Sequence, residues 1–256
     1  MQSLERGKNY ESLGNTISRI AYAYGFTASP LSISKKALVN AGADPDVKTG
    51  AAMALMNVFV AAPPSGTPPV QAPAHVWGVA HKGPNTVITF AITSTKEAIA
   101  HALVVKTALS IAETAGYTDL SVGISSVGDS ESRKRFSREL ANFFRKNHEA
   151  LSPELKQLAA HNPDSAYRAL LKENHPLLAR APRSIDYLSE GARKTMLSAL
   201  SLFESVGIPY SIQSRLSGEP GVHSEILFAI EGTAKNGMRS EVASGGRYDE
   251  HFKKER

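Results

Sequence analysis

The chain has 256 residues, of which 42% are hydrophobic and 21% are charged, and its formal net charge at pH 7 is +5. This composition indicates a soluble globular protein of one large or two small domains, and the lack of cysteine excludes disulfides and cysteine-based zinc sites. No apolar run is long enough for a membrane span or for a signal peptide, so we expect a cytoplasmic protein. The mild positive charge permits an anionic partner without requiring one.

The first part of the chain predicts a helix and then strands around a proline-rich loop. Apolar residues recur at helical spacing from Leu13 to Tyr24, and Gly25 is placed to end that helix. Three runs have strand character, namely Asn57–Ala61, His75–Ala80 and Thr86–Ile92. Because only His81–Asn85 separates the last two, we expect them to form a β-hairpin.

Helix and strand patterns then alternate. Ser94 and Glu97 have the spacing of a capping box, so a helix is expected behind them, and Gly116 is placed to end it. Asp119–Ile124 follows with strand character.

A helical and basic segment interrupts the strands at about 127–182. Helix N-caps are expected in it at Asp129, Ser152 and Asp164. A long helix from Ser189 to Gly207 follows, and then three strands: Pro209–Ser214, Ser224–Ile230 and Arg239–Ser244. Strands on both sides of an all-helical middle predict an α+β fold, with a core of 1–126 and 183–256 and a helical insertion of 127–182.

Three blocks of sequence carry a family resemblance: "ISSVGDSESRKRFSRELANFF", "LLARAPRSIDYLSEGARKTMLSALSLFESVGIPYSIQSRL" and "GGRYD". They resemble histidyl-tRNA synthetase, a class II aminoacyl-tRNA synthetase, and the regulatory subunit of ATP phosphoribosyltransferase is also similar. The resemblance is strong from about Ala98 to Asp249. It implies a mixed, mostly antiparallel sheet flanked by helices, and a homodimer whose interface contains Pro30.

The resemblance also implies a ligand-binding role for Gly245, Gly246, Arg247 and Tyr248, in the GGRYD block. A glycine pair at a strand end lets a ligand approach the backbone, but it can equally be a bulge where the sheet meets a neighbouring element. Arg247 could bind an anion; we expect it instead to be solvated or paired within the chain, at the start of a terminal helix.

The family's catalytic residues do not carry over to this sequence. Aligned without a gap, Tyr210–Ile230 places Gly218 where the family has the arginine that binds the α-phosphate. Gly221 replaces an aspartate, and Val222 and His223 replace two tyrosines of the histidine pocket. Because glycine cannot supply a cation beside the reacting phosphate, we expect no catalytic residue.

Two further motifs of the class are also not found. The loop of the second motif is reduced to His81–Asn85, with Lys82 as the nearest cation, and the third motif does not occur before Arg256. We therefore expect no cofactor; ATP and magnesium enter only if the chain is the truncated catalytic part of a divergent synthetase.

A basic stretch in the insertion suggests a second kind of partner. Its cations are Arg133, Lys134, Arg135, Arg138, Arg145 and Lys146. In the family the insertion lies over the tRNA acceptor stem, so these residues could contact an RNA backbone. The alternative is an ordinary charged helix face, with Glu131 and Glu139 as local partners. No aromatic residue is interleaved for base stacking, and no histidine pair has metal-ligand spacing, so no metal site is expected.

These patterns favour a non-catalytic protein with a binding or regulatory role, linked to histidine or tRNA. The expected partners are a second copy of the chain, and tRNA or another protein subunit, with no membrane. The alternatives are a truncated catalytic core and a purely structural dimer module.

Overall fold

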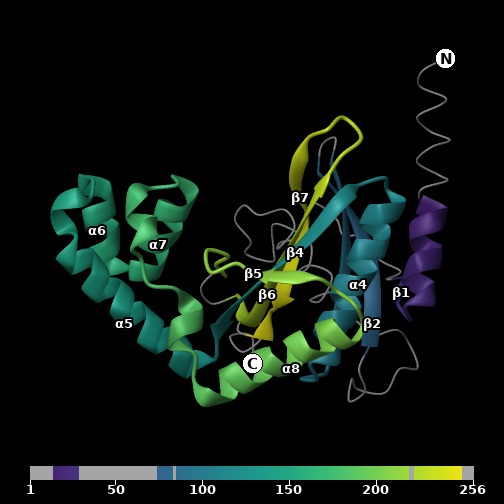
Figure 1. Cartoon of the computed structure of the whole chain (residues 1–256), viewed down its shortest axis with the longest axis horizontal. Helices are drawn as coiled ribbons and strands as arrows, with labels where there is room; N and C mark the ends of the chain where they lie inside the picture. The colour runs from purple at the N-terminus through teal and green to yellow at the C-terminus, as the bar shows by residue number, and fades with distance from the viewer. Residues whose placement is uncertain (1–13, 29–73, 83–84, 219–221, 250–256) are drawn as a thin grey trace. The chain divides into compact units, whose positions relative to one another are not determined.

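A computed structural model describes residues 14–28, 74–82, 85–218 and 222–249 (Figure 1). Pro30 and the predicted strand Asn57–Ala61 lie outside these residues, so the dimer interface and that strand stay predictions. The chain divides into two compact units. The first contains the residues up to Leu120 together with Ile230–Gly245, and the second contains Ser121–Ala229 together with the residues from Gly246 onward.

The described part of the first unit begins with a helix over residues 14–23, which ends where Gly25 adopts a φ of +81°, as its sequence predicts. β1 (Thr27–Ala28) then pairs in parallel with β2 (Ala74–Lys82), and β2 pairs antiparallel with β3 (Asn85–Thr93). The predicted hairpin is therefore confirmed, and Lys82 pairs directly with Asn85, so two residues of sequence connect the strands.

Aromatic side chains hold this first sheet to its neighbours. The ring of Phe26 lies 5.2 Å from Phe90, edge to face, and 5.4 Å from the ring of His75. Trp77 stacks on Phe90 at 6.2 Å. Such pairs add to the burial energy of the rings themselves, so Phe26, which is almost fully buried, joins the first helix to the sheet.

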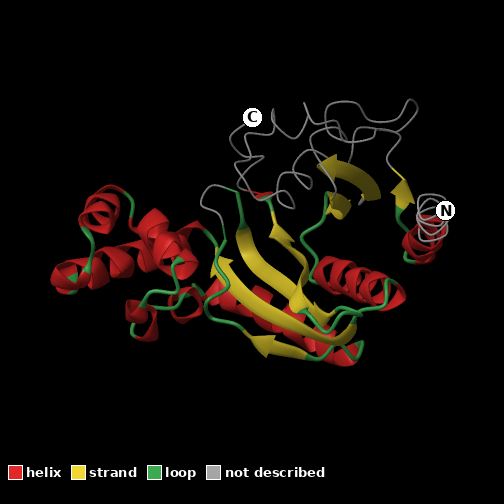
Figure 2. Cartoon of the chain, turned by 90° about the horizontal axis from the view of Figure 1, so that it is seen from above, coloured by secondary structure: helices red, strands yellow, loops and turns green. Residues whose placement is uncertain are grey.

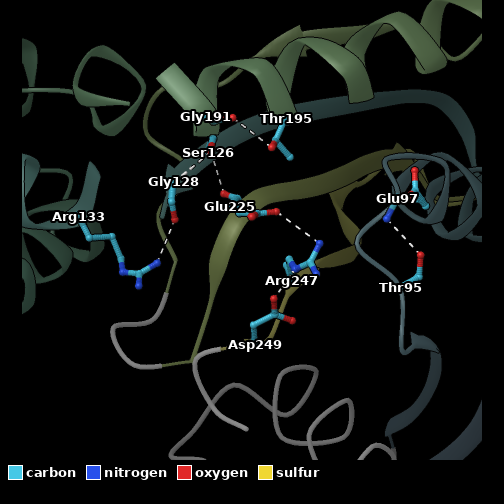
Figure 3. Close-up of polar contacts among 10 residues, drawn as sticks. All are labelled: Thr95, Glu97, Ser126, Gly128, Arg133, Gly191, Thr195, Glu225, Arg247 and Asp249. Carbon is cyan, nitrogen blue, oxygen red and sulfur yellow. Dashed lines mark hydrogen bonds and ion pairs between the residues drawn. The ribbon is translucent and has the colours of Figure 1, made fainter. Parts of the chain in front are cut away.

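α4 (Ile99–Thr114) packs on β3 through its buried residues, which are Ala102, Val105, Leu109 and Ala112. The predicted capping box in front of it is wrong. Ser94 has a φ of +59°, whereas an N-cap residue needs extended backbone, and the Glu97 N–H donates to Thr95 Oγ1 at 3.1 Å instead (Figure 3). The helix begins five residues after Ser94, without a side-chain cap.

The second sheet has the strand order β5-β4-β6-β7, with β4 (Thr118–Gly128), β5 (Tyr210–Ile212), β6 (Ser224–Thr233) and β7 (Arg239–Arg247). Figure 2 draws the strands in yellow. β4 and β5 are parallel. α8 (Glu190–Ser205) begins at its N-cap Ser189 and buries Ala192, Met196, Ala199 and Phe203, as the periodicity predicts. The strands and the last long helix thus lie where the sequence places them, and the α+β class is confirmed.

The helical segment of the second unit consists of α5 (Ser130–Lys146), α6 (Pro153–His161) and α7 (Pro163–Lys172), followed by short 3-10 turns at Pro176–Ala179 and Ser184–Tyr187. Asp129 and Ser152 cap the first two helices, as expected. The third helix is capped by Asn162 and not by Asp164, because Pro163 occupies its first turn.

α5, α6 and α7 lie together (Figure 1). They enclose a hydrophobic core of their own. Phe136 and Leu140 of α5 contribute to it, and the ring of Phe136 meets that of Tyr167 edge to face at 5.6 Å. The other buried members are Phe144, Leu151, Leu155, Ala159, Ala166, Leu170, Leu177 and Leu178. A segment with its own core is consistent with an insertion, and the boundaries at 127 and 182 stay a prediction.

A partly buried polar cluster joins the start of α5 to the start of α8. We define the Asp129 cluster as Asp129, Ser132 and Ser189. One carboxylate oxygen of Asp129 accepts from the Ser132 N–H at 2.8 Å and from its hydroxyl at 2.7 Å, and the other accepts from the Ser189 hydroxyl at 2.7 Å. The Ser189 N–H donates in turn to Ser132 Oγ at 2.8 Å. Sixty residues separate Asp129 from Ser189, so the cluster closes the helical segment on itself.

Gly128 is required immediately before this cluster. Its φ is +67°, and a Cβ there would lie 2.4 Å from the Ser132 Cβ and 2.8 Å from Leu188 Cδ2. Both the backbone conformation and the lack of space exclude a side chain. The glycine thus lets β4 end directly against the two helix starts.

The first prediction concerns Asp129. Burial raises its pKa, but hydrogen bonds from Ser132, Ser189 and the Glu131 N–H outweigh burial and lower the pKa to about 2 from 3.8. The difference corresponds to about 2 kcal/mol of folding stability. Because the folded-state pKa is the lower one, this contribution is complete above pH ~4 and is lost as the pH falls toward 2.

We therefore expect Asp129→Asn to lower the free energy of unfolding at pH 7 by about 2 kcal/mol, and by much less near pH 2, measured by urea unfolding. Asp186→Asn is the control, because Asp186 makes only an exposed ion pair with Arg183 and should change stability by less than ~1 kcal/mol. An equal loss in the two variants at pH 7 would contradict the assigned role.

Candidate functional site

The glycine pair of the GGRYD block lies inside β7, and Gly246 is closely packed. A Cβ at Gly246 would lie 2.7 Å from the Ile226 carbonyl oxygen and 2.8 Å from Leu227 Cδ2. Real Cβ atoms do not approach backbone so closely, so β6 already occupies the space that the glycine leaves. This contact explains the glycine without a ligand, and a ligand role for Gly245 and Gly246 stays a prediction.

Arg247 is the last residue of β7, not the first of a helix as expected, because the strand runs through both glycines. Its side chain is 11% exposed and bridges two carboxylates. Nε donates to Asp249 Oδ2 at 2.6 Å, and Nη1 lies 3.4 Å from Glu225 Oε2 (Figure 3). The expectation that Arg247 is paired within the chain is therefore confirmed.

Glu225 is the strained member of this group. Its φ is +52°, a left-handed conformation that is uncommon for a residue with a side chain. The strain is held at both ends of the residue: the Glu225 carbonyl accepts from the Ser126 hydroxyl at 2.9 Å, and its carboxylate pairs with Arg247. Ser126 Oγ also accepts from the Gly128 N–H at 3.1 Å, which connects this region to the start of α5.

Gly218, the position that the resemblance aligns with the family's catalytic arginine, is enclosed by its neighbours. A Cβ there would lie 2.9 Å from the Cβ of His223, 3.2 Å from Val127 Cγ1 and 3.4 Å from Leu227 Cδ1. The nearest of these atoms is the base of a buried side chain, which cannot rotate away. The local packing is therefore built for a residue with no side chain.

His223, which stands where the resemblance has a pocket tyrosine, is 9% exposed. Its ring lies 4.8 Å from that of Tyr248, at a tilt of 44°. Tyr248 thus contacts the ring that replaces a ligand-pocket residue, and both belong to the same tightly packed region.

A cavity in the second unit opens beside Gly218. The hollow and the open solvent at its mouth together measure about 550 Å³. Its lining residues are Val127, Arg133, Phe136, Asp164, Tyr167, Arg168, Ser184, Ser214, Leu216, Ser217, Gly218 and His223. We call it the arginine cavity, after Arg133 and Arg168. Sequence reasoning missed most of these residues; the one available signal was the spacing of Asp164, Tyr167 and Arg168, which places them on one helix face.

The six cations proposed for RNA binding differ in their exposure and in their partners within the chain. Arg133 is half-buried and its Nη1 donates to the Gly128 carbonyl at 2.9 Å. Arg135 pairs with Glu131, and Arg145 donates to Asn142 Oδ1 at 2.9 Å. Lys134, Arg138 and Lys146 are exposed. Local pairing thus accounts for part of the group, and an RNA surface stays a prediction.

Within the described residues, no three histidine, aspartate or glutamate side chains are grouped so that they could hold a metal ion. Over the same residues, no helix has both the length and the apolar character needed to cross a membrane.

Comparison with known proteins gives two kinds of similarity. No family model matches the chain. In sequence, it is 29% identical over 146 residues to the histidine–tRNA ligase of Symbiobacterium thermophilum, and 27% identical over 143 residues to that of Ligilactobacillus salivarius. These matches cover 57% and 55% of this chain but 34% and 33% of the two ligases. The chain thus matches about a third of the length of these curated relatives.

The fold similarity extends over nearly all of the chain. The apo histidyl-tRNA synthetase of S. aureus matches with a TM-score of 0.71 at 19% identity, over 95% of this chain and 63% of that one. A chain of the ATP phosphoribosyltransferase (HisG:HisZ) complex from Thermotoga maritima matches with a TM-score of 0.52 at 14% identity, over 93% of this chain and 91% of that one.

The fold and these matches define a class II aminoacyl-tRNA synthetase-like core. Within that class, the chain is similar in sequence and in fold to histidyl-tRNA synthetase, as the sequence resemblance implied.

The second prediction concerns Gly218. Because its Cβ has no space, Gly218→Ala should lower the free energy of unfolding by about 1–3 kcal/mol, measured by chemical denaturation. Gly191→Ala is the matched control: Gly191 lies in α8, and its Cβ would meet nothing nearer than Ser189 Oγ at 3.9 Å. That change should stabilise by about 0.5–1 kcal/mol. A neutral Gly218→Ala would show that the position can accept a side chain.

Proposed function

We propose that this chain is a non-catalytic binding or regulatory protein built on the histidyl-tRNA synthetase core, with a role linked to histidine or tRNA. The observation that carries the proposal is the packing at Gly218. In the resemblance this position holds the cation beside the reacting phosphate, and here neither the cation nor the space for a side chain is present.

The chemistry explains why this loss is decisive. Activation of an amino acid by ATP develops negative charge on the α-phosphate, and a fixed cation stabilises that charge in the transition state. Removing one such group typically costs about 10²–10³ in rate. The nearby Arg247 does not replace it, because its guanidinium bridges Glu225 and Asp249.

A second feature supports the proposal independently. In the resemblance, the turn between β2 and β3 corresponds to the long loop that holds ATP. Pairing of Lys82 with Asn85 leaves only two residues, 83 and 84, to connect these strands. A connection of that length cannot reach around a nucleotide.

The proposed role includes a partner. The matching chain from Thermotoga maritima belongs to a complex, and the match extends over 91% of that matching chain. We infer that this chain also acts with a second protein subunit or with a copy of itself, in the cytoplasm. The alternative is a truncated catalytic core whose missing motif is supplied by a further segment or another chain, and it keeps the same fold.

The third prediction tests catalysis directly. The 256-residue chain should show no histidine-dependent exchange between ATP and radiolabelled pyrophosphate above that of a heat-denatured sample. Gly218→Arg should not restore exchange, because the new side chain has no room and the loop for ATP stays short. Exchange by the unmodified chain would overturn the non-catalytic proposal and favour the truncated-enzyme alternative.

The fourth prediction concerns RNA. Any binding of tRNA should be weak and should decrease steeply with salt, since it would be directed at phosphates. The double change Arg138→Glu and Lys146→Glu reverses two exposed cations of α5 and should weaken binding, measured by filter retention at 50 mM salt. The control pair Arg193→Glu and Lys194→Glu reverses two exposed cations of α8. Equal effects of the two pairs would place the contact elsewhere.

A further inference from the structure

β5 is an edge strand of the second sheet. It pairs with β4 on one side, and none of the strands that the structure describes pairs with its other side. The Gln213 N–H donates to the Ile124 carbonyl at 2.8 Å, so the backbone groups of Ser211 and Gln213 point toward β4. Because these groups alternate in direction along a strand, those of Tyr210 and Ile212 point outward. An edge of this kind is a template for a further strand.

α8 lies along the same edge. The ring of Phe203 lies 6.1 Å from that of Tyr210, and the Tyr210 hydroxyl donates to Glu204 Oε1 at 2.8 Å. The chain turns back between α8 and β5 (Figure 1), so β5 runs toward the start of the helix. Ile212 lies on the same face of β5 as Tyr210, about 7 Å further along the strand. The side chain of Ile212 therefore faces α8 about one helical turn before Glu204.

An exposed apolar patch lies at this edge. Leu200 is one turn before Glu204 on the same side of α8, and Leu197 is about one turn further toward the start of the helix. Leu197 is 60% exposed, Ile212 is 45% exposed and Leu200 is half-buried. We define the α8–β5 edge as these three side chains together with the outward backbone of β5. Apolar side chains thus lie next to backbone groups with which an added strand can pair.

The α8–β5 edge is cationic at the end where α8 begins. Arg193 and Lys194 precede Leu197 by four and three residues, so they lie on its side of the helix. Both are exposed, and within the described residues neither side chain makes a hydrogen bond or an ion pair. Glu190 is the acidic residue of the first turn, and the two cations outnumber it. A partner that covers the edge is therefore matched by negative charge at this end.

We propose that the α8–β5 edge binds an extended segment of another protein, which adds a strand to the sheet beside β5. In this mode of recognition, main-chain hydrogen bonds supply affinity and alternate side chains supply specificity. The alternate apolar side chains of the segment contact Leu197, Leu200 and Ile212, and its acidic residues meet Arg193 and Lys194. If the segment runs antiparallel to β5, which is the commoner pairing, its acidic residues precede its apolar ones.

This inference rests on the proposed function only in that a second protein takes part. It names the surface that this partner occupies and the chemistry of the segment that occupies it. The pyrophosphate exchange assay does not bear on it, so the two proposals fail separately.

The probe is a synthetic peptide of sequence Asp-Asp-Val-Thr-Val-Thr-Val with a fluorescent label at its carboxyl end, titrated with the intact chain by fluorescence anisotropy. We expect saturable binding. Opposite an outward-pointing residue of β5, an antiparallel partner residue points its N–H toward β5 and its side chain toward α8. N-methylation of the three valines should therefore abolish binding, and N-methylation of the two threonines should not.

Substitutions in the chain locate the contact. Ile212→Glu should weaken binding about 10-fold or more, because the peptide would cover an unpaired carboxylate. Met238→Glu is the control: Met238 is 65% exposed and belongs to the first unit, so this change should leave binding unchanged. Reversing both cations, with Arg193→Glu and Lys194→Glu, should shift the preference of the chain to a peptide that begins with Lys-Lys.

All four substituted residues are exposed, and thermal unfolding shows whether each variant is folded. If Ile212→Glu is not folded, the charge reversal supplies the test. The proposal is overturned by no saturable binding, by equal binding of the valine-methylated peptide, or by equal effects of Ile212→Glu and Met238→Glu. It is also overturned if ultracentrifugation of the chain alone shows a dimer that Ile212→Glu dissociates, because the edge would then bind a second copy.

Discussion

The contact between Asp129 and Ser189 is the constraint on which the second unit depends. One carboxylate caps α5 and also holds the hydroxyl that caps α8, so the two helix starts are fixed to each other. The cluster thus joins the two ends of the helical segment that contains the core around Leu140 and the cations of α5. Ser126 and Gly128 extend the same network into β4 and to Glu225. The arginine cavity is a consequence, because its walls come from α5, α7 and the connection that follows β5.

Close packing also characterises the region that the resemblance aligns with the active site of a synthetase. At Gly218 and Gly246, atoms of neighbouring residues occupy the volume that a side chain would need. His223 and Leu227 lie within 3.4 Å of the Cβ position at Gly218, and the Glu225–Arg247 pair joins β6 to the end of β7. On the proposal of a non-catalytic role, this packing keeps the fold while it reduces the room for a nucleotide and an amino acid.

Local patterns predicted the regular elements well. The hairpin of β2 and β3, the buried stripe of α8 and the caps at Asp129 and Ser152 depend on residues close in sequence, and the structure confirms them. The capping box at Ser94 failed because the chain turns there with a positive φ, and Asp164 lost the capping role to Asn162 through a neighbouring proline. The arginine cavity could not be predicted, because Arg133, Arg168 and Gly218 meet only through tertiary packing.

The central claim is that the catalytic pocket of this synthetase-like core is filled by its own side chains. The most direct measurement is a calorimetric titration with a non-hydrolysable analogue of histidyl adenylate, which spans the histidine and phosphate positions at once. We expect no saturable binding of the analogue, because Gly218 and Gly246 leave no space and Arg247 is bridged by two carboxylates. Micromolar binding that Gly246→Ala abolishes and Gly191→Ala leaves unchanged would contradict the claim.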